Sequence, residues 1–121
     1  SIFEAIDKAI NRGVGISILM ESSDKPEDGI LVDAITKMKV SFPKAKVYYW
    51  ANTEAEFEGG KVHAKIAVAD GQVCFISSAN LTEYAMEKNM EAGTLIHGGS
   101  IPEKLYDHLK ALVTKKVVKL T

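Results

Sequence analysis

The feature that most constrains this fold is an Asp-Gly pair set between two strand-like segments. The segments are VHAKIAVA at 62–69 and QVCFISS at 72–78, and both are rich in β-branched and apolar residues. An Asp-Gly pair in this position is a strong signal for a β-hairpin, because both residues tolerate the left-handed backbone of a two-residue turn. The sequence therefore predicts an antiparallel hairpin that reverses at Asp70–Gly71.

This hairpin would gather polar side chains on one of its faces. Side chains alternate between faces along a strand, so His63 and Lys65 are expected to share a face. With a two-residue turn, Lys65 would lie opposite Ile76 and His63 opposite Ser78, with opposed Cβ atoms about 5 Å apart. Asn80 would follow on the same side, just past the strand end. An imidazole, an ammonium group, a hydroxyl and an amide would thus converge.

Two further polar residues of the hairpin are predicted to lie away from this group. Asp70 sits at the turn, a full strand length from His63 and of opposite parity, which indicates a turn or salt-bridge residue. Ser77 is expected on the face opposite to Ser78.

The rest of the chain alternates between helical and strand-like patterns. A possible capping box of Ser1 and Glu4 opens the first helix, and a second is expected at Ser100 and Glu103. Strands are predicted at 14–20, 46–50 and 90–96 and at the final KVVKL; helices are predicted up to Gly13, from Leu31 to before Pro43, at 82–88 and after Ser100; and loops are predicted at 21–29 and 51–60. This order predicts an α/β sandwich, with a mixed β-sheet flanked by helices in a single domain over 1–121.

Composition excludes several classes of protein. The formal charge is −1, so the chain is no nucleic-acid polycation, and phosphate recognition must be local. The single cysteine, Cys74, rules out an internal disulfide and favours a reducing, cytoplasmic location. No apolar run approaches the roughly 20 residues of a membrane span, so no stable membrane insertion is expected. The three histidines and one cysteine show no zinc-like spacing, so no metal or cofactor is predicted.

The motif residues resemble those of a known family. The run H63-A-K65, then D70, then S77-S78-A-N80, then N89-M-E91 is similar to the HKD motif of the phospholipase D superfamily, which reads His-x-Lys-x4-Asp, then Gly-Ser/Thr-x-Asn, then an acidic residue. Ser77 stands where Gly is usual. The resemblance covers most of the chain. The sequence around the segments VADG and SSANLT is similar to that of HKD proteins from anti-phage systems of the DISARM type.

The resemblance implies a metal-independent phosphodiesterase with a phosphohistidine intermediate. His63 would attack phosphorus, and a second histidine would protonate the leaving oxygen and later activate water. Lys65 and Asn80 would hold the non-bridging oxygens, and Ser78 would add a hydrogen bond to them. Glu91 would accept a hydrogen bond from the other nitrogen of His63 and fix its tautomer.

A site of this kind needs two HKD sets, and the sequence supplies one. His97 lacks a lysine two residues on, and His108 with Lys110 lies on a predicted helix, where such residues diverge and are usually solvated. We therefore predict one half-domain. Its second half would come from an identical chain in a homodimer, or from a longer natural protein of which this chain is a piece.

The motif is compatible with more than one class of substrate. A nuclease acting on DNA or RNA, with nucleic acid as the substrate partner, is the main hypothesis. The alternatives are a phospholipid hydrolase or transferase of the same superfamily, and a catalytically inactive nucleic-acid- or partner-binding module.

Overall fold

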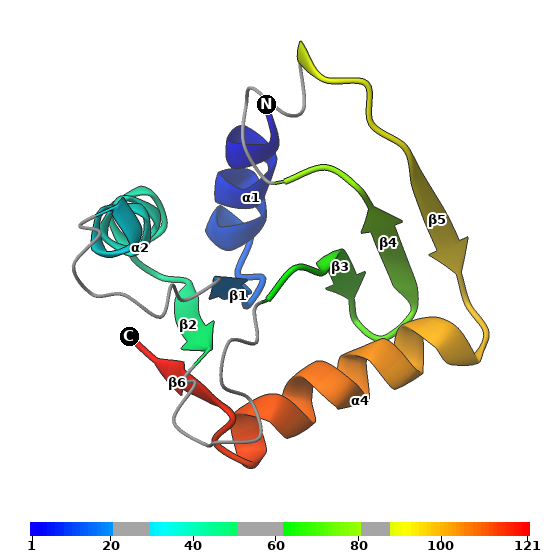
Figure 1. The fold of residues 1–121 in the computed structure, drawn as a ribbon. Helices are drawn as coiled ribbons and strands as arrows, with labels where there is room; N and C mark the ends of the chain where they lie inside the picture. Colours follow the sequence, from blue (N-terminus) through cyan, green and yellow to red (C-terminus); the bar gives the residue numbers. More distant parts are fainter. Residues whose placement is uncertain (21–29, 51–61, 81–87) are drawn as a thin grey trace. The chain divides into compact units, whose positions relative to one another are not determined.

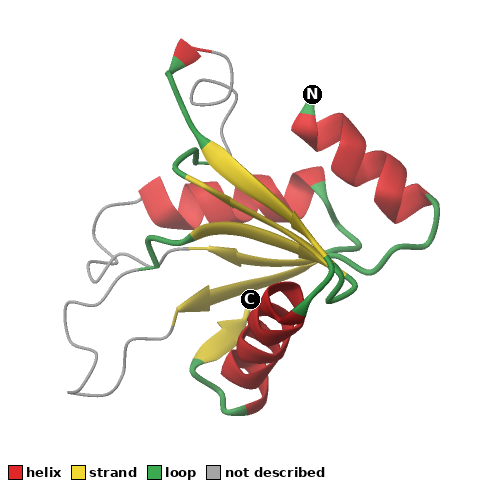
Figure 2. Ribbon diagram, turned by 90° about the vertical axis from the view of Figure 1, so that its right-hand side faces the viewer, coloured by secondary structure: helices red, strands yellow, loops and turns green. Residues whose placement is uncertain are grey.

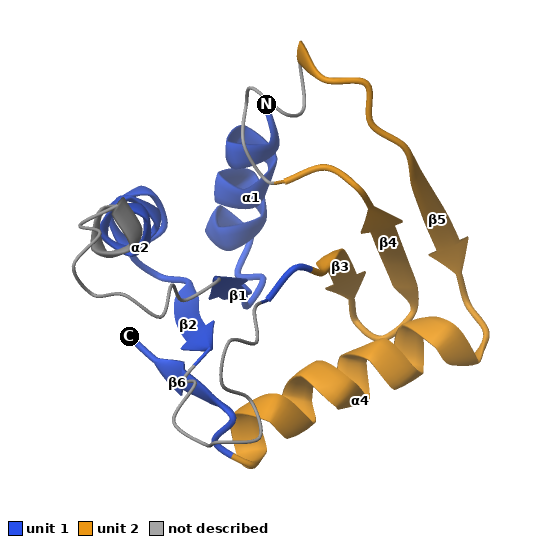
Figure 3. Ribbon diagram, in the orientation of Figure 1, with its two compact units in different colours: residues 1–63, 116–121 blue, residues 64–115 orange. Residues whose placement is uncertain are grey.

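The computed structural model describes residues 1–20, 30–50, 62–80 and 88–121, which belong to two compact units (Figures 1 and 3). Unit 1 comprises Ser1–His63 and Lys116–Thr121, and unit 2 comprises Ala64–Lys115. The loops expected at 21–29 and 51–60, and the helix expected at 82–88 except for its last residue, fall outside the described residues.

Unit 1 is built on a three-stranded mixed sheet. Its elements are α1 (Ile2–Asn11), β1 (Ser17–Met20), α2 (Ile30–Ser41), β2 (Lys46–Trp50) and β6 (Val118–Leu120). The strand order is β1-β2-β6, in which β2 runs parallel to β1 and antiparallel to β6. The parallel pair requires a crossover between its strands, and α2 lies within that connection.

The core of unit 1 centres on the residue that follows α2, on the central strand β2 and on its neighbour β6. Phe42, Val47 and Val118 are at most 4% exposed. The Phe42 ring meets the ring of Phe3 on α1 edge-on, with the centroids 5.4 Å apart and the planes at 79°. Burying a Val or Phe side chain contributes roughly 1.5–3 kcal/mol. The predicted capping box of α1 is confirmed, since the Ser1 hydroxyl accepts the Glu4 N–H.

Unit 2 is built on a three-stranded antiparallel sheet in the order β3-β4-β5. The strands are β3 (Lys65–Ala69), β4 (Val73–Ser77) and β5 (Gly93–His97), followed by α4 (Ser100–Thr114). Helix α4 contacts all three strands, and Figure 2 draws it as the long helix nearest the label of the C-terminus. Cys74 in the central strand is 1% exposed, as expected for a packed thiol rather than a reactive one.

The predicted hairpin is present, but its predicted register is wrong by one residue. Lys65 lies opposite Ser77 rather than Ile76. Asp70 and Gly71 do adopt positive φ, at 55° and 65°, and the Gln72 N–H donates to the carbonyl of Ala69. Gln72 itself stays outside the ladder, and its carbonyl accepts the Gly98 N–H at 2.7 Å. The two-residue turn therefore forms as predicted, and Gln72 is an extra residue after it that shifts the pairing of β4 with β3 by one.

The predicted α/β class with a mixed sheet is confirmed, and the strands of the described residues form two sheets. The capping box expected at Ser100 is wrong, because Ser100 is already helical and the cap position falls on Gly99, which has no side chain. The strand expected at 90–96 begins at Gly93 and ends at His97. Among the described helices, none combines the length and apolar character that crossing a bilayer requires.

One glycine in unit 2 is needed for close packing. A Cβ built at Gly93 would lie 2.7 Å from an edge carbon of the Phe75 ring and 2.9 Å from the carbonyl oxygen of Ile76. Both distances are below any normal van der Waals contact, and the second involves backbone that cannot rotate away. The missing side chain at Gly93 therefore lets the Phe75 ring lie against β5.

We predict that Gly93→Ala lowers the free energy of unfolding by about 1–3 kcal/mol, because it overpacks this contact. Gly15→Ala is the matched control, because its Cβ would meet nothing within 4 Å and its backbone needs no positive φ. Urea denaturation of both variants measures the difference. Equal stability of the two variants would show that the Phe75 ring does not lie against Gly93.

Candidate active site

Two of the predicted site residues, Ser78 and Glu91, lie where the end of β4 meets the segment that enters β5. Ser77, the last residue of β4, pairs with Gly93, the first residue of β5. The ladder continues one step further, where the Ser78 N–H donates to the carbonyl of Ala92 at 3.0 Å. Beyond Ser78 the chain leaves the sheet. The sheet thus brings Glu91 beside the two serines of the motif.

The Ser78 hydroxyl and the Glu91 carboxylate are joined directly. Oγ of Ser78 lies 2.5 Å from Oε2 of Glu91 and donates to it. The same Oγ accepts the backbone N–H of Ala92 at 3.2 Å. Both side chains are exposed, so this contact fixes groups that solvent would otherwise leave free to rotate. The alternation of residues around Glu91 gave no indication of this contact.

Ser77 occupies the place where the family pattern has Gly, and its side chain has its own role. Its Oγ accepts the Ala79 N–H at 3.0 Å and donates to the carbonyl of Ala92 at 3.4 Å. The first bond closes a short serine turn that leads toward Asn80. The predicted faces of the two serines are wrong: Lys65 and Ser77 are opposed and share a face, so Ser77 rather than Ser78 lies on the face of the motif lysine.

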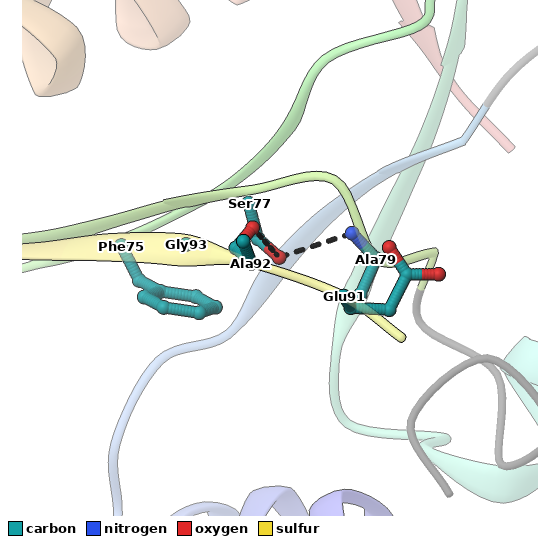
Figure 4. Close-up of a pocket in the computed structure, with 6 residues that line it drawn as sticks. All are labelled: Phe75, Ser77, Ala79, Glu91, Ala92 and Gly93. Atoms are coloured by element: carbon teal, nitrogen blue, oxygen red, sulfur yellow. Dashed lines mark hydrogen bonds between the residues drawn. The ribbon is translucent and has the colours of Figure 1, made fainter. Parts of the chain in front are cut away.

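A pocket of about 190 Å³ opens at this junction. Figure 4 shows the Phe75 ring at one end of it, the Glu91 carboxylate at the other, and Ser77 between them. Its remaining lining residues are small: Ala79, Ala92 and Gly93. The sequence analysis missed Phe75 and Gly93 as neighbours of Glu91, and only the correct hairpin register could have identified them.

The other motif residues are placed separately. Lys65 begins β3 and is half-buried, and Asn80 follows the serine turn and is exposed. Asp70 lies in the hairpin turn, as predicted, at the far end of the strands from Ser78. His63 is exposed and is assigned to unit 1, whereas the other motif residues belong to unit 2. The predicted contact between His63 and Glu91 stays a prediction.

The described part of the chain offers no rival arrangement around its other histidines. His108 is exposed on α4, as predicted, and its neighbour Lys110 lies over the Tyr106 ring at 5.7 Å. His97 ends β5 opposite Val73. No three side chains of the metal-binding types gather among these described residues.

Comparisons with known proteins agree on one family. The family described as "Cardiolipin synthase, PLD-like domain" matches residues 1–113, a range that contains the whole motif. Cardiolipin synthase B of Salmonella typhi is 23% identical over 112 residues, which is 93% of this chain and 25% of that protein. Cardiolipin synthase of Listeria welshimeri is 27% identical over 109 residues, which is 88% of this chain and 21% of that protein.

The chain therefore spans a quarter or less of the length of these relatives. The resemblance to the phospholipase D superfamily is confirmed, while the finer likeness to DISARM-type proteins stays a prediction. The family match extends across both units and beyond the motif itself, so it does not rest on a few polar residues. On this evidence the chain belongs to the family of phospholipase D-like domains of the cardiolipin synthase type.

Proposed function

We propose that this chain is one half of a metal-independent phosphodiesterase site that acts on phospholipids, by hydrolysis or by transfer to an alcohol. The observation that carries the proposal is the family match over residues 1–113, because it includes every motif residue from His63 to Glu91. The Ser78–Glu91 contact supports it, since it brings two members of the motif together.

The names of the relatives favour a lipid substrate over nucleic acid. The Salmonella and Listeria proteins are named as synthases of cardiolipin, which is a phospholipid. The formal charge of −1 gives a nucleic-acid substrate no electrostatic support either. The lipid alternative therefore replaces the nuclease as our first choice. The inactive binding module and the cytoplasmic location stay predictions.

In the first step, one ring nitrogen of His63 would attack the phosphorus atom of the substrate. The bond from phosphorus to the leaving oxygen breaks, and a histidine of the second half gives that oxygen its proton. Lys65 and Asn80 would hold the non-bridging oxygens, where negative charge grows in the transition state. Glu91 would hold the other ring nitrogen of His63 and stabilise the positive imidazole.

In the second step, a hydroxyl oxygen would attack phosphorus and break the bond to His63. The histidine of the second half, now neutral, accepts the proton of that hydroxyl. Water as the attacking group gives hydrolysis, and an alcohol gives transfer to a new ester. The two outcomes use the same residues of this chain, so they differ only in what reaches the phosphohistidine.

The first prediction concerns substrate and nucleophile. We expect turnover of phosphatidylglycerol or phosphatidylcholine vesicles, and none of single-stranded DNA, duplex DNA or RNA. His63→Ala should abolish turnover, and Lys65→Ala should lower it about 10²–10³-fold, as loss of a transition-state donor does. His108→Ala, on an exposed face of α4, is the matched control and should keep full activity.

Mass spectrometry of the lipid products would separate hydrolysis, which releases phosphatidic acid, from transfer, which yields a new phosphodiester. Turnover of nucleic acid alone would restore the nuclease hypothesis. Full activity of His63→Ala would refute the assignment of the nucleophile, and an inert protein that still binds a partner would favour the inactive module.

The second prediction is that turnover survives EDTA, because the lysines of the two halves would supply the positive charge that divalent ions supply elsewhere. The measurement is the initial rate before and after chelation. Loss of activity in chelator that Mg²⁺ restores would point to a metal-dependent mechanism instead.

The third prediction is that activity requires pairing, because the nucleophile and the general acid must come from two HKD sets. If identical chains form the pair, they would meet around a two-fold axis, so specific activity should fall on dilution as the dimer dissociates. If the second half belongs to a longer protein, the 121-residue chain should be inactive until that half is added. Light scattering combined with activity measurements distinguishes the two. Undiminished turnover by a strict monomer would contradict both.

A further inference from the structure

The hydroxyl of Ser78 both donates and accepts a hydrogen bond within the protein. It donates to Oε2 of Glu91 at 2.5 Å and accepts the Ala92 N–H at 3.2 Å. A second possible acceptor, the carbonyl oxygen of Ala92, lies further away at 3.3 Å. The resemblance to the family suggested a different role, in which this hydroxyl would donate to a phosphate oxygen.

A serine hydroxyl has a single hydrogen, so it can donate one strong hydrogen bond at a time. An ionised carboxylate is a stronger acceptor than a neutral carbonyl, and the shorter distance is also to the carboxylate. The hydrogen of Ser78 is therefore committed to Glu91. A phosphate oxygen would have to displace that carboxylate before it could accept a bond from Ser78.

We propose that Ser78 is a positioning residue that holds the carboxylate of Glu91, and that it is not a phosphate ligand. The inference rests on the proposed function, in which Glu91 orients His63. Ser78 binds Oε2, and a carboxylate has a second oxygen, Oε1, that can accept a further hydrogen bond.

Because Glu91 is exposed, its carboxylate needs a neighbouring residue that holds it in position. An exposed glutamate samples many rotamers, and each wrong rotamer would leave the imidazole without its partner. The Ser78 hydroxyl restricts the carboxylate to one place. Misplacing a group that orients a catalytic side chain typically lowers the rate by about 10- to 100-fold.

Ser78 is itself held in place by hydrogen bonds to the backbone of Ala92. The Ser78 N–H donates to the Ala92 carbonyl while the Ala92 N–H donates back to the Ser78 hydroxyl. The Ser77 hydroxyl also donates to that carbonyl. Three bonds thus tie the end of β4 to the segment that carries Glu91, so Ser78 is held firmly enough to position a neighbour.

The test is a double-mutant cycle with the full 121-residue chain in its active, paired form and the vesicle substrate that it turns over. Ser78→Ala should lower kcat about 10- to 100-fold and leave KM unchanged. Ser78→Thr keeps the hydroxyl and should restore most of the rate. In the Glu91→Ala background, Ser78→Ala should have no further effect, because its target is gone.

Thr94→Val is the matched control. It also removes a hydroxyl, from an exposed residue of β5 that lies opposite Ile76 and has no part in the proposed site, and it should leave both constants unchanged. An additive effect of Ser78→Ala and Glu91→Ala, with a raised KM and weaker inhibition by inorganic phosphate for Ser78→Ala alone, would overturn the proposal and make Ser78 a phosphate donor.

A second double-mutant cycle, measured on protein stability instead of activity, tests this inference independently of the proposed function. If the wild-type protein turned over no phosphodiester, the proposed function would fail, yet Ser78→Ala and Glu91→Ala should still be coupled in urea denaturation. We expect a coupling of about fivefold in the unfolding equilibrium constant, the usual size for one hydrogen bond. Strict additivity there would overturn the contact itself.

Discussion

The turn at Asp70–Gly71 determines which side chains of the hairpin share a face, and the site depends on that choice. Both residues adopt left-handed backbone, and Gln72 follows them as an extra residue before β4 pairs with β3 at Val73. A slip of one residue in a hairpin moves every side chain to the other face. The observed register places Lys65 opposite Ser77, and so puts the motif lysine on the face of the pocket.

A second register, between β4 and β5, sets the junction where β4 ends and β5 begins. Because Ser77 pairs with Gly93, Ser78 pairs with Ala92, and the side chain of Glu91, one residue before Ala92, comes within hydrogen-bonding distance of the Ser78 hydroxyl. Gly93 lets the Phe75 ring lie against the strand, which leaves a pocket with one apolar end and one acidic end.

Much of the fold was predictable, because it depends on short-range signals. The Asp-Gly pair predicted the hairpin, and Ser1 with Glu4 predicted the start of α1. The register was not predicted, because the Asp-Gly pair gives no sign of the extra residue, Gln72, that precedes the pairing of Ala69 with Val73. The cap expected at Ser100 failed because Gly99 makes the turn into α4. The site residues were suggested by their spacing, whereas the Ser78–Glu91 contact arises only where two strand ends leave the sheet, which alternation does not describe.

The central claim is that His63 forms a covalent bond to phosphorus, and the most direct measurement is to trap that intermediate. The active, paired protein would be mixed with a phospholipid labelled at phosphorus, quenched in alkaline denaturant within the first turnover, and mapped by peptide mass spectrometry. The account predicts a base-stable, acid-labile adduct on the peptide that contains His63, absent from His63→Ala and reduced in Lys65→Ala. Turnover with no adduct on His63, or with the label on another residue, would contradict it.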